Sequence, residues 1–359
     1  VTLYHWDLPL SLGDRGGWLN DKIVDWFGEY SRFCFKEYGS KVKYWVTLNE
    51  PYIQASNGYC GQPTEWVNLA PGGFYENCEW TAYLSGHNML LAHGRAVDIY
   101  YRQFQQSQRG CIGVANVAIW FEPETDSADD IAAAERAFES TFGWFSDPIY
   151  SPTGDYPAVM KERMEGLSKK EGRSTSRLPK FTQKQLKSLK ADFLGINYYV
   201  SRKVSSKLSK TCSDPLMNDI GVNITGNTVG DVIGNSWIGY YPDGLRKTLN
   251  YIKTHYNNVP VFILENGVYD VAQEELTDDT RIHYIKGHLE AVHKAIKEDH
   301  CNVKQYSVWS LMDLFAFSSG YTQPMGLYNV DFSSPNRTRT PKKSAQWYSR
   351  VIANNAIVD

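Results

Sequence analysis

Six short apolar runs, separated by segments with helical periodicity, restrict the folds that this chain can adopt. The runs are rich in β-branched and aromatic side chains, as buried strands are. From Ile282 to Ile296, apolar residues recur at three- and four-residue spacing, as on the buried face of a helix. Such alternation predicts βαβ crossovers and a parallel sheet. The predicted strands are residues 1–6, 43–49, 111–120, 192–199, 260–265 and 305–310. The predicted helices are residues 20–38, 81–104, 127–145 and 282–296.

Polar side chains stand at the C-terminal end of nearly every predicted strand. They are His5, Asp7, Asn49, Glu50, Asn197, Tyr199, Glu265, Asn266 and Trp309. In a closed barrel of parallel strands these ends meet at one mouth, whereas in an open sheet they lie along a line. No glycine-rich dinucleotide or phosphate loop follows a strand, so the doubly wound sheet is less favoured. The sequence therefore predicts an α/β fold, a (β/α)8 barrel of which six strands are visible.

Composition limits the partners of the chain. With 359 residues and a net charge of −3, it has no general electrostatic attraction to nucleic acid, and no apolar run is long enough for a membrane span. Aromatic residues make up 14% of the chain, which suits a pocket for a small neutral molecule. No paired cysteine or histidine motif suggests a metal, and no cofactor is predicted. The sequence gives no oligomeric state.

Six motifs occur in order along the chain. They are YHWDLP (4–9), TLNEP (47–51), GDYP (154–157), DFLGINYY (192–199), LENG (264–267) and WSLMD (309–313). Through them the chain resembles glycoside hydrolase family 1, the β-glucosidase family. The resemblance covers essentially all 359 residues and implies one glycosidase barrel domain whose first two βα units are absent, with Val1 in the third strand.

The resemblance implies a retaining mechanism with two carboxylates about 5–5.5 Å apart. Glu50 of the NEP motif would be the acid/base, and Glu265 of the ENG motif the nucleophile. An ionised Glu265 is expected to raise the pKa of Glu50 and keep it protonated. Taken singly, either residue would more often cap a helix at a strand end. The substrate-binding residues implied are His5, Asn49, Tyr199, Trp309 and Phe317.

The segment after the last strand departs from the family pattern. The family has W-S-x-x-D-N-F-E-W, whereas this chain has WSLMDLFAF, with Leu314 for Asn, Ala316 for Glu and Phe317 for Trp. The family's Gln that binds the sugar and its Arg beside the nucleophile would lie in the absent units. Three functions stay open: a retaining β-glycosidase with an altered glycone site, a transglycosidase, and a sugar-binding pseudoenzyme.

Two further features concern loops and location. Residues 203–239 are rich in Gly, Ser and Asn and predict a loop insertion at the barrel mouth. Cys60 and Cys78 flank a loop and are either a disulfide or two unrelated thiols. With the sequons at Asn223 and Asn336, they favour a secreted glycoprotein.

Overall fold

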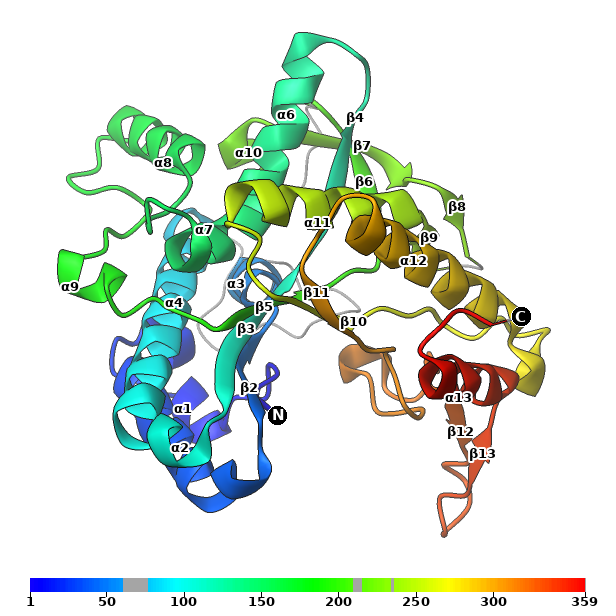
Figure 1. The fold of residues 1–359 in the computed structure, drawn as a ribbon. Coiled ribbons are helices and arrows are strands. Elements are labelled where there is room, and N and C mark those ends of the chain that lie inside the picture. The colour runs from blue at the N-terminus through cyan, green and yellow to red at the C-terminus, as the bar shows by residue number, and fades with distance from the viewer. Residues whose placement is uncertain (61–76, 209–214, 234–235, 359) are drawn as a thin grey trace.

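A six-stranded parallel sheet forms the centre of the molecule (Figure 1). The structure is a computed structural model that describes residues 1–60, 77–208, 215–233 and 236–358. The strand order is β1 (Thr2–Tyr4), β2 (Tyr44–Asn49), β3 (Cys111–Val117), β5 (Phe193–Asn197), β10 (Val261–Glu265) and β11 (Val303–Tyr306). Each strand pairs in parallel with the next along the chain, and the described residues contain no pair between β1 and β11. This confirms the predicted parallel sheet of six strands, and the seam between β1 and β11 is open in the described residues.

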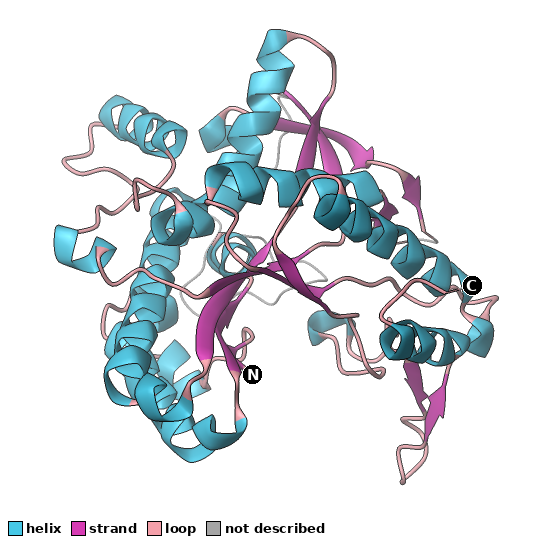
Figure 2. Cartoon of the chain, viewed as in Figure 1, coloured by secondary structure: helices cyan, strands magenta, loops and turns pink. Residues whose placement is uncertain are grey.

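Helices follow the strands and lie around the sheet (Figure 2). The longest, α4 (Cys78–Gln103), packs against α2 (Ile23–Tyr38), and α11 (Pro242–His255) packs against α12 (Asp279–Lys297). Where one of these helices was predicted, its first residue lies within three residues of the predicted start, because the apolar stripe that defines the helix also faces the sheet. The remaining helices are α1 (Leu10–Gly13), α3 (Pro51–Tyr59), α5 (Gln105–Gln108), α6 (Ala128–Phe138), α7 (Trp144–Tyr150), α8 (Ala158–Lys170), α9 (Gln183–Leu186), α10 (Pro215–Ile220) and α13 (Lys343–Asn354).

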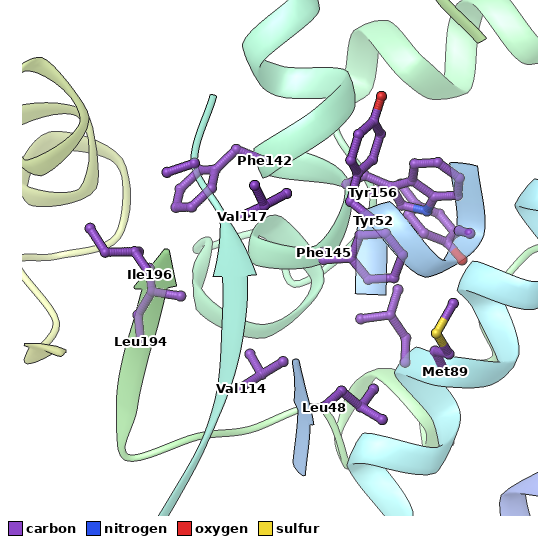
Figure 3. Close-up of a cluster of buried hydrophobic side chains, with 14 of the residues drawn as sticks. Leu48, Tyr52, Met89, Val114, Val117, Phe142, Phe145, Tyr156, Leu194 and Ile196 are labelled. Carbon is purple, nitrogen blue, oxygen red and sulfur yellow. The ribbon is translucent and has the colours of Figure 1, made fainter. Parts of the chain in front are cut away.

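Both faces of the central sheet are apolar. Figure 3 shows one cluster, in which Val114, Leu194 and Ile196 from the strands lie with helical side chains such as Met89. A second cluster comprises Val46, Ala115, Phe193 and Phe262, in which the rings of Phe193 and Phe262 stack with centroids 4.3 Å apart. Burial on both faces is expected of parallel sheets covered by crossover helices. Because apolar side chains cover both faces, polar side chains reach a cavity at the ends of the strands.

Two predicted elements are wrong in their extent. The strand predicted over residues 111–120 ends at Val117, and β4 (Trp120–Pro123) belongs to a second sheet with β6 (Ser201–Ser205) and β7 (Asn223–Thr228). The helix predicted over 127–145 ends at Phe138 and is followed by a π-turn, Glu139–Gly143, before α7. In the first case an apolar run continues across the break, and in the second Phe138, Phe142 and Phe145 keep helical spacing across it, so hydrophobicity gives no sign of either break.

The predicted insertion, residues 203–239, contains regular structure in its described parts. These are β6, α10, β7, β8 (Asp231–Val232) and the start of β9 (Gly239–Tyr240), while residues 209–214 and 234–235 lie outside the described residues. Cys60 and Cys78 form a disulfide, which resolves the two interpretations of this pair. A third small sheet, β12 (Tyr328–Val330) with β13 (Arg339–Pro341), follows the outer loop described below.

Candidate active site

Glu50 lies at the end of β2, where the strand register is irregular. Its backbone is left-handed, with φ 44° and ψ 58°, and the next residue, Pro51, begins α3. A residue before proline is disfavoured in the right-handed helical region, and left-handed backbone is strained for a residue with a side chain. Hydrogen bonds from Glu50 N to Ala115 O (2.8 Å) and from Gln54 N to Glu50 O (3.2 Å) fix this conformation. The backbone therefore sets the direction of the Glu50 carboxyl before any ligand binds.

Glu265 ends β10, and a second register irregularity places it opposite Asn197 of β5. Its neighbour Asn266 is fully buried, and its amide donates to Tyr198 O (2.7 Å). Gly267 is required by close packing, because a Cβ there would lie 1.9 Å from the carbonyl oxygen of Trp309. The ENG motif thus joins the end of β10 to the segment after β11. Irregular strand ends that redirect side chains are common beside active sites.

Asn197 connects the two carboxyls. Its side-chain amide donates to Glu50 Oε1 (3.0 Å) and to Asn49 Oδ1 (3.0 Å), and it also lowers the pKa of Glu265 by hydrogen bonding. The hydroxyl of Tyr199 donates to Glu265 Oε2 (2.8 Å). We call these five residues the carboxyl cluster. The sequence placed Asn197 at a strand end but gave it no role; its position two residues before Tyr199, at the end of the strand beside β10, was the available signal.

Both carboxyls are buried. Glu50 is only 7% exposed, and Glu265 is only 8% exposed. Burial raises the pKa of Glu50 to about 7, and the hydrogen bond from Asn197 opposes this shift. Burial also raises the pKa of Glu265 well above its usual value, with repulsion from Glu50 as the second cause. The predicted repulsion is therefore present, but burial, not repulsion, accounts for the shift of Glu50, which corrects the expected cause.

His5, Trp309 and Phe317 lie together in the wall of the cavity. The ring of His5 lies 5.6 Å from that of Trp309 and 5.8 Å from that of Phe317, and His5 Nε2 is 3.1 Å from the amide of Asn49. Burial lowers the pKa of His5, so its ring is neutral near pH 7. Phe317 also packs on Trp6, with centroids 4.6 Å apart. The substitution for Trp in the family pattern therefore still supplies an aromatic ring next to His5.

One cavity of about 400 Å³ brings the predicted site residues together. Glu50, Glu265, His5, Tyr199, Trp309 and Phe317 all line it. Asn49 is buried beside them and is not among the lining residues; it contacts the site through His5 and Asn197. Leu314 and Ala316, the other two departures from the family pattern, line the same cavity. The rest of the wall is mostly apolar and includes Ile53, Val117, Ile119, Phe121, Val200, Met217, Trp237 and Met325.

A buried ion network holds the segment that carries these departures. We call residues 311–327 the outer loop. Asp313 accepts hydrogen bonds from Gly326 N (2.9 Å) and Val330 N (3.2 Å), and Lys342 Nζ lies 3.2 Å from Asp313 and 2.7 Å from Asp270. Lys342 is 1% exposed. The network fixes the base of the outer loop, whereas Phe315 and Phe317 within it are 61% and 39% exposed.

No group of three or more metal-ligating side chains occurs in the part of the chain that the structure describes. Among the same residues, no helix is long and apolar enough to cross a bilayer.

Comparison with known proteins relates this geometry to a family. The model of glycosyl hydrolase family 1 matches residues 1–357. Beta-glucosidase 30 of Arabidopsis thaliana is 40% identical over 99% of this chain, which spans 63% of that relative's length. The cytosolic beta-glucosidase of Cavia porcellus is 37% identical over 99% of this chain and 75% of its own length. The solved structure of aphid myrosinase superposes with a TM-score of 0.87 at 39% identity, covering 98% of this chain and 74% of that one.

Proposed function

Because this chain belongs to glycosyl hydrolase family 1, we propose that it is the main part of a retaining β-glycosidase that cleaves small O-linked β-glycosides. The observation that carries the proposal is the carboxyl cluster, in which two buried glutamates that line one cavity share Asn197 as a hydrogen-bond donor. Several relatives are named β-glucosidases, which is consistent with this reaction class.

The roles follow from the environments of the two residues. Glu50, whose pKa is raised to about 7, is protonated in much of the population at neutral pH and donates a proton to the leaving oxygen. Glu265 in its ionised form attacks the anomeric carbon and forms a glycosyl ester, displacing the aglycone. Glu50, now ionised, takes a proton from water, which attacks the anomeric carbon and releases Glu265. The Tyr199 hydroxyl, whose pKa is raised by burial, stays protonated and donates to Glu265 in the free enzyme.

Ionisation of Glu265 is the demanding step. Its pKa is raised by burial and by Glu50, and no Lys or Arg forms an ion pair with it among the described residues. The proposal therefore requires that a cation, such as the Arg found in the family outside this segment, lies beside Glu265 in the active protein.

The glycone preference is part of the proposal. At the outer end of the sugar site, Leu314, Ala316 and Phe317 replace residues that would offer an amide, a carboxylate and an indole N–H. We propose a sugar whose outer end is less polar than that of glucose, differently configured, or substituted there. The exposed ring of Phe317 beside His5 and Trp6 is the surface that such a group would contact.

The test is the stereochemistry of the product. Proton NMR of the first sugar released from aryl β-glycosides by the full-length protein should show the β-anomer before mutarotation. A fluorinated slow substrate should leave its sugar covalently attached to Glu265, as peptide mass spectrometry would reveal. Release of the α-anomer would exclude the retaining mechanism.

Transglycosylation is the second candidate, favoured by the apolar wall formed by Ile53, Ile119, Phe121 and Met217, which suits an acceptor alcohol. Adding a hydrophobic alcohol should then produce alkyl glycosides in place of free sugar. Complete absence of turnover on a broad panel would favour a sugar-binding pseudoenzyme. We also propose that the protein is secreted, since it contains the Cys60–Cys78 disulfide and two sequons; tunicamycin sensitivity of its mass would test this.

A further inference from the structure

Arg202 is a cation in the wall of the cavity that has no partner among the described residues. It lies in β6, three residues after Tyr199, and its side chain is half-buried. Within the described ranges its guanidinium makes neither an ion pair nor a side-chain hydrogen bond, and burial is the cause of its pKa shift. Burial lowers its pKa, and no acidic group counteracts that shift. Arginine nevertheless remains charged at any physiological pH, so Arg202 carries a permanent positive charge in a half-buried position.

The small sheet explains why Arg202 faces the cavity. Phe121 of β4 is its direct partner in the parallel pair, and Val204, two residues along β6, is opposite Ile224 of β7. Side chains two apart on a strand, and partners across a pair, share one face of a sheet. Phe121, Arg202 and Ile224 all line the cavity. The opposite face carries Glu122, which pairs with Lys247 and is therefore not a partner for Arg202.

The charge of Arg202 is not used by the carboxyl cluster. Burial and Asn197 affect the pKa of Glu50, and burial, Glu50, Tyr199 and Asn197 affect that of Glu265, without a contribution from Arg202. Among the described residues that line the cavity, Arg202 is the only Lys or Arg. Two lining residues next to it are apolar: Val200, two residues before it, and Phe121, its partner on β4. A charge held among apolar groups without a partner is costly unless a ligand supplies the counter-charge.

We propose that Arg202 forms an anion subsite for the aglycone, so that the cavity prefers β-glycosides whose leaving group carries a carboxylate, sulfate or phosphate. This inference rests on the proposed function for its sugar end. Arg202 lies in the small sheet beside Phe121 of the apolar wall, whereas Glu50 and Glu265 lie at the ends of central strands, which places the anion on the aglycone rather than on the sugar. The planar guanidinium fork matches the oxygens of all three groups. The anion would be held by Arg202 while the apolar wall contacts the remainder of the aglycone.

The experiment compares leaving groups that differ only in charge. The probes are 4-(carboxymethyl)phenyl β-glycoside and its carboxamide, built on the glycone that the full-length protein hydrolyses fastest; the methylene group keeps the two phenols similar in acidity. Sulfomethyl and phosphonomethyl analogues distinguish among the anions. A charge-assisted hydrogen bond predicts about tenfold higher kcat/KM for the anionic probe. This ratio should fall to about one in Arg202→Met and be partly retained in Arg202→Lys.

Lys203→Met is the matched control, since Lys203 is the next residue of β6 and is exposed on the other face. It should keep the wild-type ratio. A wild-type ratio near one, or an equal fall in both Met variants, would overturn the anion subsite.

If the wild-type protein hydrolyses no aryl β-glycoside at all, the proposed function fails, and the subsite is tested by binding alone. Calorimetry with 4-hydroxyphenylacetate and 4-hydroxyphenylacetamide should then show tighter binding of the anion to wild-type and Lys203→Met protein than to Arg202→Met. Equal affinities for the two compounds, or equal binding by all three proteins, would overturn the inference.

Discussion

The carboxyl cluster and the outer loop line the same cavity but are held in place by different interactions. In the carboxyl cluster, each side chain comes from the end of a central strand, and neighbouring side chains bind one another directly. In the outer loop, the buried ion network lies at the base. The residues that line the cavity, such as Ala316 and Phe317, have apolar side chains and take no part in that network. The difference suggests that reaction type depends on the sheet, whereas sugar preference depends on a loop that can change without disturbing the carboxyls.

The strongest test of this difference removes Glu265, the proposed nucleophile. Glu265→Gln keeps the size of the side chain and an oxygen that can accept from Tyr199, but the neutral amide cannot form a glycosyl ester. We expect kcat in the full-length protein to fall by at least about 10⁴-fold, as for other essential nucleophiles. Loss of sugar attachment in the slow-substrate experiment is the measurement. A Glu265→Gln protein that still accumulates the covalent sugar would separate the reaction from the carboxyl cluster.

Removing the proton donor should have a smaller effect that depends on the substrate. In Glu50→Gln, substrates with poor leaving groups should lose about 10²–10⁴-fold in kcat, whereas activated phenol leaving groups should lose much less in the first step, because they depart without a proton. The plot of rate against leaving-group pKa should therefore steepen. Equal losses for all leaving groups would argue against an acid role for Glu50.

The sequence predicted the carboxyl cluster better than its surroundings, and the reason is geometric. Strand periodicity and the strand-end motifs located Glu50 and Glu265, because parallel strands bring their ends together whatever loops follow. The position of Asn197 between the two carboxyls, which the sequence did not predict, depends on the register of β5 against β10. The position of Arg202 in the cavity wall depends on the pairing of β6 with β4. Pairing between strands far apart in sequence is not encoded in the local pattern. The break at Val117 was missed because the apolar run continues across it into β4.

The outer loop should depend on its ion network. Lys342→Met leaves Asp270 and Asp313 without this buried cation, and breaking a buried pair in this way typically destabilises a protein by about 3–5 kcal/mol. The neighbouring Lys343→Met is the control, because Lys343 and its partner Asp279 are 55% and 64% exposed. It should change the free energy of unfolding by less than about 1 kcal/mol. Urea unfolding of both variants is the measurement, and equal effects would show that the network does not hold the loop.

The altered sugar end can be tested by restoring the family pattern. In Ala316→Glu with Phe317→Trp, a carboxylate in the outer loop should make charge-assisted bonds to glucose hydroxyls. We expect kcat/KM for a simple β-glucoside to rise by about 10- to 100-fold for each bond formed. The comparison is with a panel of other β-glycosides, whose turnover should not rise in parallel. Unchanged glucoside turnover in a folded double mutant would mean that the outer loop does not contact the sugar.

The smallest expected effect is on stability, and it concerns the cost of keeping Glu50 buried. In the unfolded chain a Glu has a pKa of about 4.3, whereas burial raises the pKa of Glu50 to about 7 in the folded protein. Between these values the folded state holds a proton that the unfolded state releases, so the free energy of unfolding falls as pH rises. Removing the charge should reverse this loss.

Glu50→Gln should therefore stabilise the protein at pH 7.5, by on the order of 3 kcal/mol, and by only about 1 kcal/mol at pH 5, where the folded wild-type carboxyl is protonated and the unfolded one is largely ionised. The Gln side chain keeps an oxygen that can accept from Asn197, so that bond need not be lost. Glu290→Gln, at an exposed position of α12, should change stability by less than about 0.5 kcal/mol at both pH values. Urea titrations at the two pH values give the comparison. A Glu50→Gln protein less stable than wild type at pH 7.5 would show that the carboxyl cluster stabilises the fold through its charge, and that its two glutamates are not strained by burial.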